Sequence, residues 1–192
     1  MKIHGTAKGG ALSKKDFGVA FGGGGAPAPC NFDYNYTCGA DQNTIGNSGY
    51  EQYAIRNITG TDTTVTTATW YFRRHTTGNA PTGTAQAHMY DTDGSTLLAS
   101  SDTQSVTGIG ALADNCTITG TGIVFTFDPA TLWADDYYLT VKYTDGADRL
   151  GVLNSSCVVG TCTSPSGFEF YYGDAGSWSS SSLFLNCVTS CT

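Results

Sequence analysis

The sequence has few charged residues and almost no glutamate. Charged side chains make up 13% of the 192 residues, and Glu51 and Glu169 are the only glutamates. Helical cytosolic enzymes carry more Glu, Lys and Leu, because these residues favour helices. The abundant Gly, Thr and Ser instead favour turns and strands that face water through hydroxyl groups. The composition therefore indicates an all-β protein.

The chain also lacks the usual signatures of membrane spans and of catalysis. It has no run of about 18 apolar residues, so no membrane span is expected. It has no G-x-S-x-G, H-E-x-x-H or phosphate-binding loop. No partner residue for His75 or His88 is visible, and most aspartates fall in turns, where backbone geometry favours them. We therefore expect no catalytic residues and a non-enzymatic role.

The net charge of −7 is unevenly distributed. Residues 1–20 hold four lysines against Asp16, a net charge of +3, which leaves −10 for the rest of the chain. An acidic body disfavours nucleic acid as a partner, because phosphates need Lys or Arg. Residues 1–29 are rich in glycine and have one strand-forming patch, Phe17–Phe21. We expect an arm that adds to the sheet edge of another subunit, or an unattached tail.

The seven cysteines have no C-x-x-C spacing and no histidine close by, so a zinc site is not expected. Short spacings instead suggest local disulfides, which imply an oxidising location. The expected pairs are Cys30–Cys38, Cys157–Cys162 and Cys187–Cys191. Cys116 is then left over or pairs with Cys157. The first 25 residues lack the apolar core of a secretory signal, which leaves three explanations: a virion protein oxidised after lysis, a trimmed chain or reduced cysteines. We favour the first, and expect an extracellular or virion-surface location.

Residues 30–192 read as one β-sandwich domain after the arm. Between Thr63 and Gly146 apolar and polar residues alternate, as in strands with one buried face. Residues 128–133 are expected to form one helical turn, and the serines around Trp178 an exposed loop. The expected strands are 50–57, 63–74, 84–90, 96–100, 103–107, 116–127, 137–144, 149–153, 167–172 and 182–188.

The motifs within residues 50–186 also carry a resemblance. TWYFRRHTTGNAPTGTAQAHMYDTDGSTLLASS, then IVFTFDPATLWADDYYLTVKYTDG and a late GDAGSW, resemble the jelly-roll β-sandwich of viral fibre or virion-surface proteins and extracellular bacterial proteins. The resemblance implies a jelly-roll-like antiparallel sandwich. That family is described largely by analogy with carbohydrate-binding modules, so glycan binding is a second possibility.

Alternation also predicts a face that could bind sugar. If Ala85, Ala87 and Met89 point inward, their neighbours point outward, and such aromatic, hydrogen-bonding faces suit sugars. The alternative is a face that is solvated or covered. The candidate glycan-binding residues are Tyr71, Arg73, Gln86, His88, Tyr90, Tyr138, Lys142, Glu169, Tyr171 and Trp178.

The Asp-rich turns and the glycosylation sequons are two further features of the sequence. The Asp-rich turns suggest a possible structural calcium ion bound by Asp91, Asp93, Asp145 and Asp148, although an Asp-Gly hairpin turn explains them equally well. Four N-x-S/T sequons, at Asn35, Asn57, Asn115 and Asn154, would mark surface loops if they carry glycans. The leading expectation is a structural subunit of a virion surface, fibre or similar extracellular assembly that self-associates through its arm. A glycan-recognition domain is the alternative.

Overall fold

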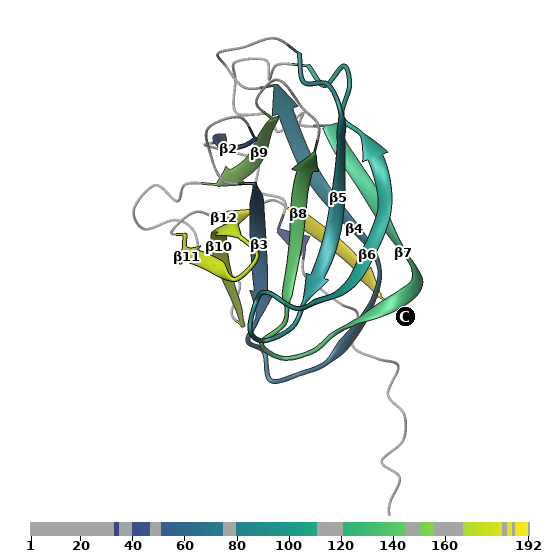
Figure 1. Ribbon diagram of the computed structural model, residues 1–192, viewed down its shortest axis with the longest axis vertical. Helices are drawn as coiled ribbons and strands as arrows, with labels where there is room; N and C mark the ends of the chain where they lie inside the picture. The colour runs from purple at the N-terminus through teal and green to yellow at the C-terminus, as the bar shows by residue number, and fades with distance from the viewer. Residues whose placement is uncertain are drawn as a thin grey trace, which may run out of the picture.

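Two antiparallel sheets pack face to face in the computed structural model (Figure 1). The structure describes residues 33–34, 40–46, 51–74, 80–110, 121–144, 150–155, 167–181, 184–185 and 187–191. All regular elements of this part are strands, and none of its residues form a helix that could span a membrane. The expected all-β sandwich is confirmed. The arm, residues 1–29, lies outside the described residues.

The first sheet has six strands in the order β11-β10-β3-β8-β5-β6. Its central strand β8 pairs with β3 on one side and with β5 on the other. The bounds are β3 (Gln52–Asn57), β5 (Thr84–Tyr90), β6 (Leu97–Ser105), β8 (Tyr138–Thr144), β10 (Phe168–Asp174) and β11 (Ser177–Ser180).

The second sheet has seven strands and is built around β4 (Thr63–Arg74). β4 pairs with β7 along one side, and with β13 and then β9 along the other. The remaining strands extend the sheet outward from these. Their bounds are β1 (Asp33–Tyr34), β2 (Ala40–Ile45), β7 (Thr121–Trp133), β9 (Leu150–Ser155), β12 (Phe184–Leu185) and β13 (Cys187–Cys191).

The core lies between the sheets and follows the predicted alternation. Ala85, Ala87 and Met89 of β5 are fully buried, and so are Leu139 and Val141 of β8. The facing sheet contributes large side chains from alternate positions of its strands, which close the space between the layers. These include Trp70, Phe72, Phe125, Trp133, Leu150 and Val152, all fully buried.

Two local expectations are wrong, and one strand was not expected. Residues 128–133 form no helical turn but the end of β7, because Thr131, Leu132 and Trp133 pair with the start of β4. The serines beside Trp178 are not a loop, since Ser177–Ser180 form β11 against β10. The polar segment before Gly46 contains a further strand, β2, which pairs with β9.

On one side of the sandwich, a side chain rather than a strand ladder links the two sheets. β6 and β7 are edge strands of different sheets and lie next to each other (Figure 1). The carboxylate of Asp102 on β6 accepts the backbone N–H of Thr126 on β7 at 2.6 Å. β6 also carries register irregularities where it pairs with β5. Bulges and charges on edge strands discourage the addition of a further strand.

The layered core predicts a sharp contrast between two leucines. Leu139 is fully buried on β8, whereas Leu97 is 50% exposed on β6. Leu139→Ala should lower the free energy of unfolding by about 2–5 kcal/mol. Leu97→Ala should change it by less than about 0.5 kcal/mol. Urea denaturation of both variants measures this, and equal effects would contradict the assigned inward face.

Candidate functional site

The outer face of the six-stranded sheet carries most of the predicted sugar-binding residues. The pairings place Glu169, Arg56, Tyr138 and Tyr90 in one row across four strands. The next row contains Tyr171, Thr140 and His88, and the row after it Lys142 and Gln86. Arg56 and Glu169, which are 113 positions apart in the sequence, therefore share one surface.

Tyr71 and Arg73 were expected on this face, and that expectation is wrong. They lie on β4, whose inward residues Trp70 and Phe72 are fully buried. Tyr71 and Arg73 therefore face outward from the seven-stranded sheet, on the opposite side of the sandwich. Alternation along one strand identifies inward and outward positions, but it does not tell to which sheet the strand belongs.

The β10–β11 hairpin contacts the turn between β5 and β6 through Trp178. The indole Nε1–H of Trp178 donates to the carbonyl of Gly94 at 2.8 Å, and the backbone N–H of Gly176 donates to the same oxygen at 2.8 Å. A Cβ atom at Gly94 would lie 2.5 Å from the indole Nε1, and Gly94 has a φ of +65°. The Asp93-Gly94 turn thus provides the close approach that Trp178 needs.

Trp178 closes a second, smaller apolar cluster on the outer face. Its ring stacks on Tyr138 with centroids 5.8 Å apart and an interplanar angle of 11°. Tyr90 and Tyr171 meet the same pair edge-on. As a result only 6% of Tyr90 and 8% of Tyr138 are exposed, and Ala54 is fully buried. We call these five residues the outer aromatic cluster.

This burial changes the interpretation of the face. A sugar-stacking ring must present one side to the ligand, and here the two central rings are covered by protein. Tyr90 and Tyr138 therefore do not form an open platform in this structure. A covered face was the alternative left open in the sequence analysis. Tyr90 and Tyr138 are covered in this way, by a hairpin of the same chain.

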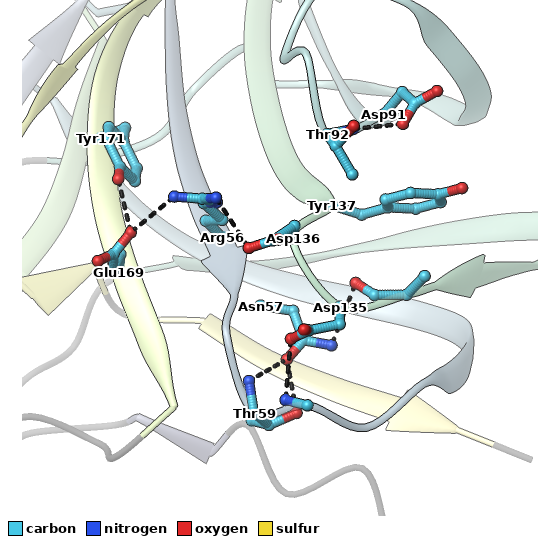
Figure 2. A network of polar contacts seen from close by, with 12 residues as sticks. Arg56, Asn57, Thr59, Asp91, Thr92, Asp135, Asp136, Tyr137, Glu169 and Tyr171 are labelled. Atoms are coloured by element: carbon cyan, nitrogen blue, oxygen red, sulfur yellow. Dashed lines mark hydrogen bonds and ion pairs between the residues drawn. The ribbon is translucent and has the colours of Figure 1, made fainter.

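A polar network borders the outer aromatic cluster (Figure 2). Arg56 bonds Asp136 at 2.8 Å and Glu169 at 3.2 Å, and its guanidinium carbon lies 5.6 Å from the ring centre of Tyr138. The hydroxyl of Tyr171 donates to Glu169 at 2.6 Å. Burial, together with this hydrogen bond, raises the pKa of the Tyr171 hydroxyl. Arg56 was not among the predicted residues, although its position in the alternating strand 50–57 was a usable signal.

The charged carboxylates of this network remain in contact with water. The side chains of Asp136 and Glu169 are 45% and 42% exposed. Each is already paired with Arg56, and exposed pairs of this kind contribute little to stability. The network therefore orients Arg56 over Tyr138 and places charge along one border of the outer aromatic cluster.

His88 is buried in the neutral form. It is 9% exposed, and its Nδ1 lies 3.0 Å from the hydroxyl of Ser100. Burial, and to a smaller extent the positive charge of Lys142, lowers the pKa of His88 to about 4. The remaining predicted neighbours are also engaged: Gln86 donates to the carbonyl of Ser101 at 2.7 Å, and Lys142 bonds Glu51 at 3.2 Å. These side chains hold strands together.

The structure describes two of the four residues that were predicted to bind calcium, Asp91 and Asp93. Asp93 accepts the backbone N–H groups of Ser95 and Thr96 at 2.7 and 2.8 Å, and the Thr96 hydroxyl at 2.8 Å. These bonds hold the pKa of Asp93 well below its usual range. Asp91 accepts the N–H of Thr92. Both carboxylates thus shape the hairpin turn. Asp145 and Asp148 lie outside the described residues, and no group of three potential metal ligands occurs among those described.

Asn57 is a structural residue rather than a glycan acceptor. It is fully buried, and its side-chain amide donates to the carbonyls of Thr61, Trp133 and Ala134 at 2.9–3.2 Å. Its side-chain oxygen accepts the backbone N–H and the hydroxyl of Thr59 (Figure 2). The folded chain offers no access to this amide, so the suggestion of a surface sequon at Asn57 is wrong. Asn154 lies within β9, and the other two sequons lie outside the described residues.

The predicted Cys187–Cys191 disulfide is also wrong. Cys187 is a free, fully buried cysteine, and burial raises the pKa of its thiol. The two cysteines lie at opposite ends of the single strand β13. Four residues of strand span about 13 Å, whereas a disulfide needs Cα atoms within about 7 Å. Cys30, Cys38, Cys116, Cys157 and Cys162 lie outside the described residues.

No protein-family model and no curated protein matches the chain.

Removing the close approach at Gly94 should loosen the hairpin. Gly94→Ala places a methyl group against the indole of Trp178 and forces alanine into a positive φ, so we expect a loss of about 2 kcal/mol or more. Gly108→Ala is the matched control, because Gly108 has a φ of +84° but nothing within 4 Å of its Cβ position. Thermal unfolding and Trp fluorescence measure both, and equal losses would contradict a specific Gly94–Trp178 contact.

The buried neutral His88 predicts a distinct pH dependence. The unfolded chain binds a proton at His88 near pH 6.5, whereas the folded chain does so near pH 4. The stabilisation from neutral His88 is therefore complete above pH 6.5 and is lost as the pH falls towards 4, by about 3 kcal/mol at most. The difference in unfolding free energy between the wild type and His88→Gln should fall over this window. A constant difference would contradict the assignment.

Proposed function

We propose that the protein is a non-enzymatic structural subunit of a virion surface, a fibre or a similar extracellular assembly, which self-associates through residues 1–29. The observation that carries the proposal is the use of the outer aromatic cluster for internal packing. Trp178, Tyr138 and Tyr90 hold the β10–β11 hairpin on the sheet instead of facing a ligand. Polar side chains that could act in catalysis or metal binding, such as His88 and Asp93, also have structural partners.

Two features support contact with other subunits. Apolar side chains on β6 and β7 are about half exposed, with Leu97 at 50%, Val124 at 49% and Leu132 at 47%. Such side chains supply apolar area to a protein partner. The charge distribution of +3 in residues 1–20 and −10 in the rest of the chain favours docking of the arm of one copy on the body of another.

The proposal predicts that assembly depends on the arm and on salt. Full-length protein should elute in size-exclusion chromatography with a light-scattering mass above one chain. A chain without residues 1–29 should be monomeric, and 0.5 M salt should weaken assembly of the full-length chain, because it screens charges beyond a few ångströms. Replacing Lys2, Lys8, Lys14 and Lys15 by Gln should act like the deletion, whereas Lys142→Gln on the body is the control. An unchanged mass after deletion would refute assembly through the arm.

Glycan recognition is the alternative for the same surface. Its remaining support is the half-buried Tyr171 beside the 42% exposed Glu169, at the border of the outer aromatic cluster. A glycan array on the monomeric chain without residues 1–29 separates the two functions. Specific sugar binding that is lost in Tyr171→Ala would favour the alternative.

A further inference from the structure

Three buried polar side chains gather on the outer face of the six-stranded sheet, where β3, β8 and β5 are neighbours (Figure 1). Gln52 is 2% exposed, Thr140 is fully buried and His88 is 9% exposed. They are three of the six polar side chains that are buried in the described part of the chain. Burial of polar groups costs free energy unless they bond to one another. Their mutual contacts therefore decide what this group can do.

The strand register brings a hydroxyl, an amide and an imidazole together. Thr140 on β8 lies opposite His88 on β5. On its other side Thr140 lies opposite Ala54, and Gln52 is two residues earlier on β3. The hydroxyl of Thr140 donates to the side-chain carbonyl oxygen of Gln52 at 3.2 Å. Residues directly opposite on one face of a sheet have Cβ atoms about 4.5–5.5 Å apart, so His88 and Thr140 are side-chain neighbours.

These groups are the parts of an acyl-transfer reaction. A hydroxyl attacks an amide carbon when a base takes its proton and a positive charge stabilises the oxygen of the intermediate. His88 is a neutral imidazole that can take the proton. Its Nδ1 lies 3.0 Å from the hydroxyl of Ser100, and when Nδ1 donates to that hydroxyl, Nε2 is the acceptor. Lys142 lies opposite Gln52 on the same face and supplies the positive charge.

The reacting atoms need little movement to meet. The Cδ carbon of Gln52 is one bond, about 1.2 Å, from the oxygen that the Thr140 hydroxyl already contacts. Reacting atoms in a near-attack geometry are about 3–3.5 Å apart. A small change in the side-chain torsions of Gln52 therefore brings its Cδ to the hydroxyl oxygen.

We propose that Thr140 and Gln52 form an intramolecular ester that joins β8 to β3 covalently. A bond forms between Oγ1 of Thr140 and Cδ of Gln52 while the hydroxyl proton passes to His88. The C–N bond of the amide then breaks, and the proton passes from His88 to the departing nitrogen. Ammonia leaves, is protonated by water and is diluted, which carries the reaction forward without an oxidant or other reactant. Burial of both side chains protects the ester from hydrolysis.

The ester would make the centre of the six-stranded sheet covalent. It would join two residues that are 88 positions apart in the sequence. Each chain reacts once, so the reaction is compatible with a non-enzymatic role. The ester goes beyond the proposed function and does not depend on it, because a monomeric chain can also carry it.

The mass of the fully reduced, denatured protein tests the ester. One ammonia is released, so the wild type should be about 17 Da lighter than its sequence. Trypsin should yield residues 16–56 linked to residues 75–142. Neutral hydroxylamine should separate the two peptides, because it cleaves esters and leaves amides intact. Thr140→Val should have the full mass and no link, whereas Thr140→Ser keeps the hydroxyl and should keep the link.

Three results would overturn the proposal. The first is a wild-type chain that keeps its full mass and yields separate peptides after prolonged incubation at neutral pH. The second is a link that persists in Thr140→Val. The third is a link that resists hydroxylamine, which would be an amide between Lys142 and Gln52.

The role of His88 is tested by the rate of the reaction. In cell-free synthesis, the loss of mass should be about 100-fold slower or more in His88→Gln, because a positioned base contributes at least that factor. Thr140→Ser, which retains the base, shows that a variant of this face can still react. An unchanged rate in His88→Gln would contradict the assignment of the base.

Stability provides a second measurement. Removing the ester opens a long covalent loop, so Thr140→Val should lower the Tm by about 10 °C. Thr189→Val is the matched control, because Thr189 is 5% exposed but lies on β13 of the other sheet. It should lower the Tm by less than half as much. Equal losses would contradict a stabilising ester at Thr140.

Discussion

The sandwich depends on the burial of β8 on both of its faces. Inward, Leu139 and Val141 close the main core, and outward, Tyr138 and Thr140 are covered by neighbouring side chains. A strand buried on both faces is usually the centre of a parallel sheet between helices, whereas antiparallel sheets commonly leave one face in water. Here the second cover is a hairpin of the same sheet, and the contact of Trp178 with Gly94 holds it in place. The low exposure of Tyr90 and Tyr138 follows from this cover.

The main core was predictable because it depends on a local pattern. Alternation along the chain identified the strands over residues 63–74 and 84–90 with the bounds that the structure has, and it placed Ala87 and Val141 inside. Period-two burial is a property of single strands, so it needs no knowledge of what lies next to them. The turn at Asp93-Gly94 was predictable for the same reason.

The candidate site was less predictable, because it depends on contacts between distant segments. Nothing in the local pattern around Tyr71 states that β4 belongs to the other sheet. Nothing around Trp178 states that its ring reaches Tyr138, forty residues earlier in the chain. The error at Cys187 has another origin, since close spacing in sequence was taken as closeness in space. An extended strand separates such residues instead. Asn57 shows the same limit, because a sequon motif carries no information on burial.

The buried free thiol of Cys187 also affects thiol–disulfide exchange in the chain. Exchange between thiols and disulfides proceeds through the thiolate, and the apolar surroundings of Cys187 disfavour that form and block access to it. Cys191, at the other end of β13, is disulfide-bonded. While the sheet is intact, the thiol of Cys187 is therefore unable to attack that disulfide. In an unfolded chain it is ionised more readily and free to move. Packing around Cys187 thus protects the native disulfide from scrambling, and a defect in this part of the core would appear first as mispaired cysteines.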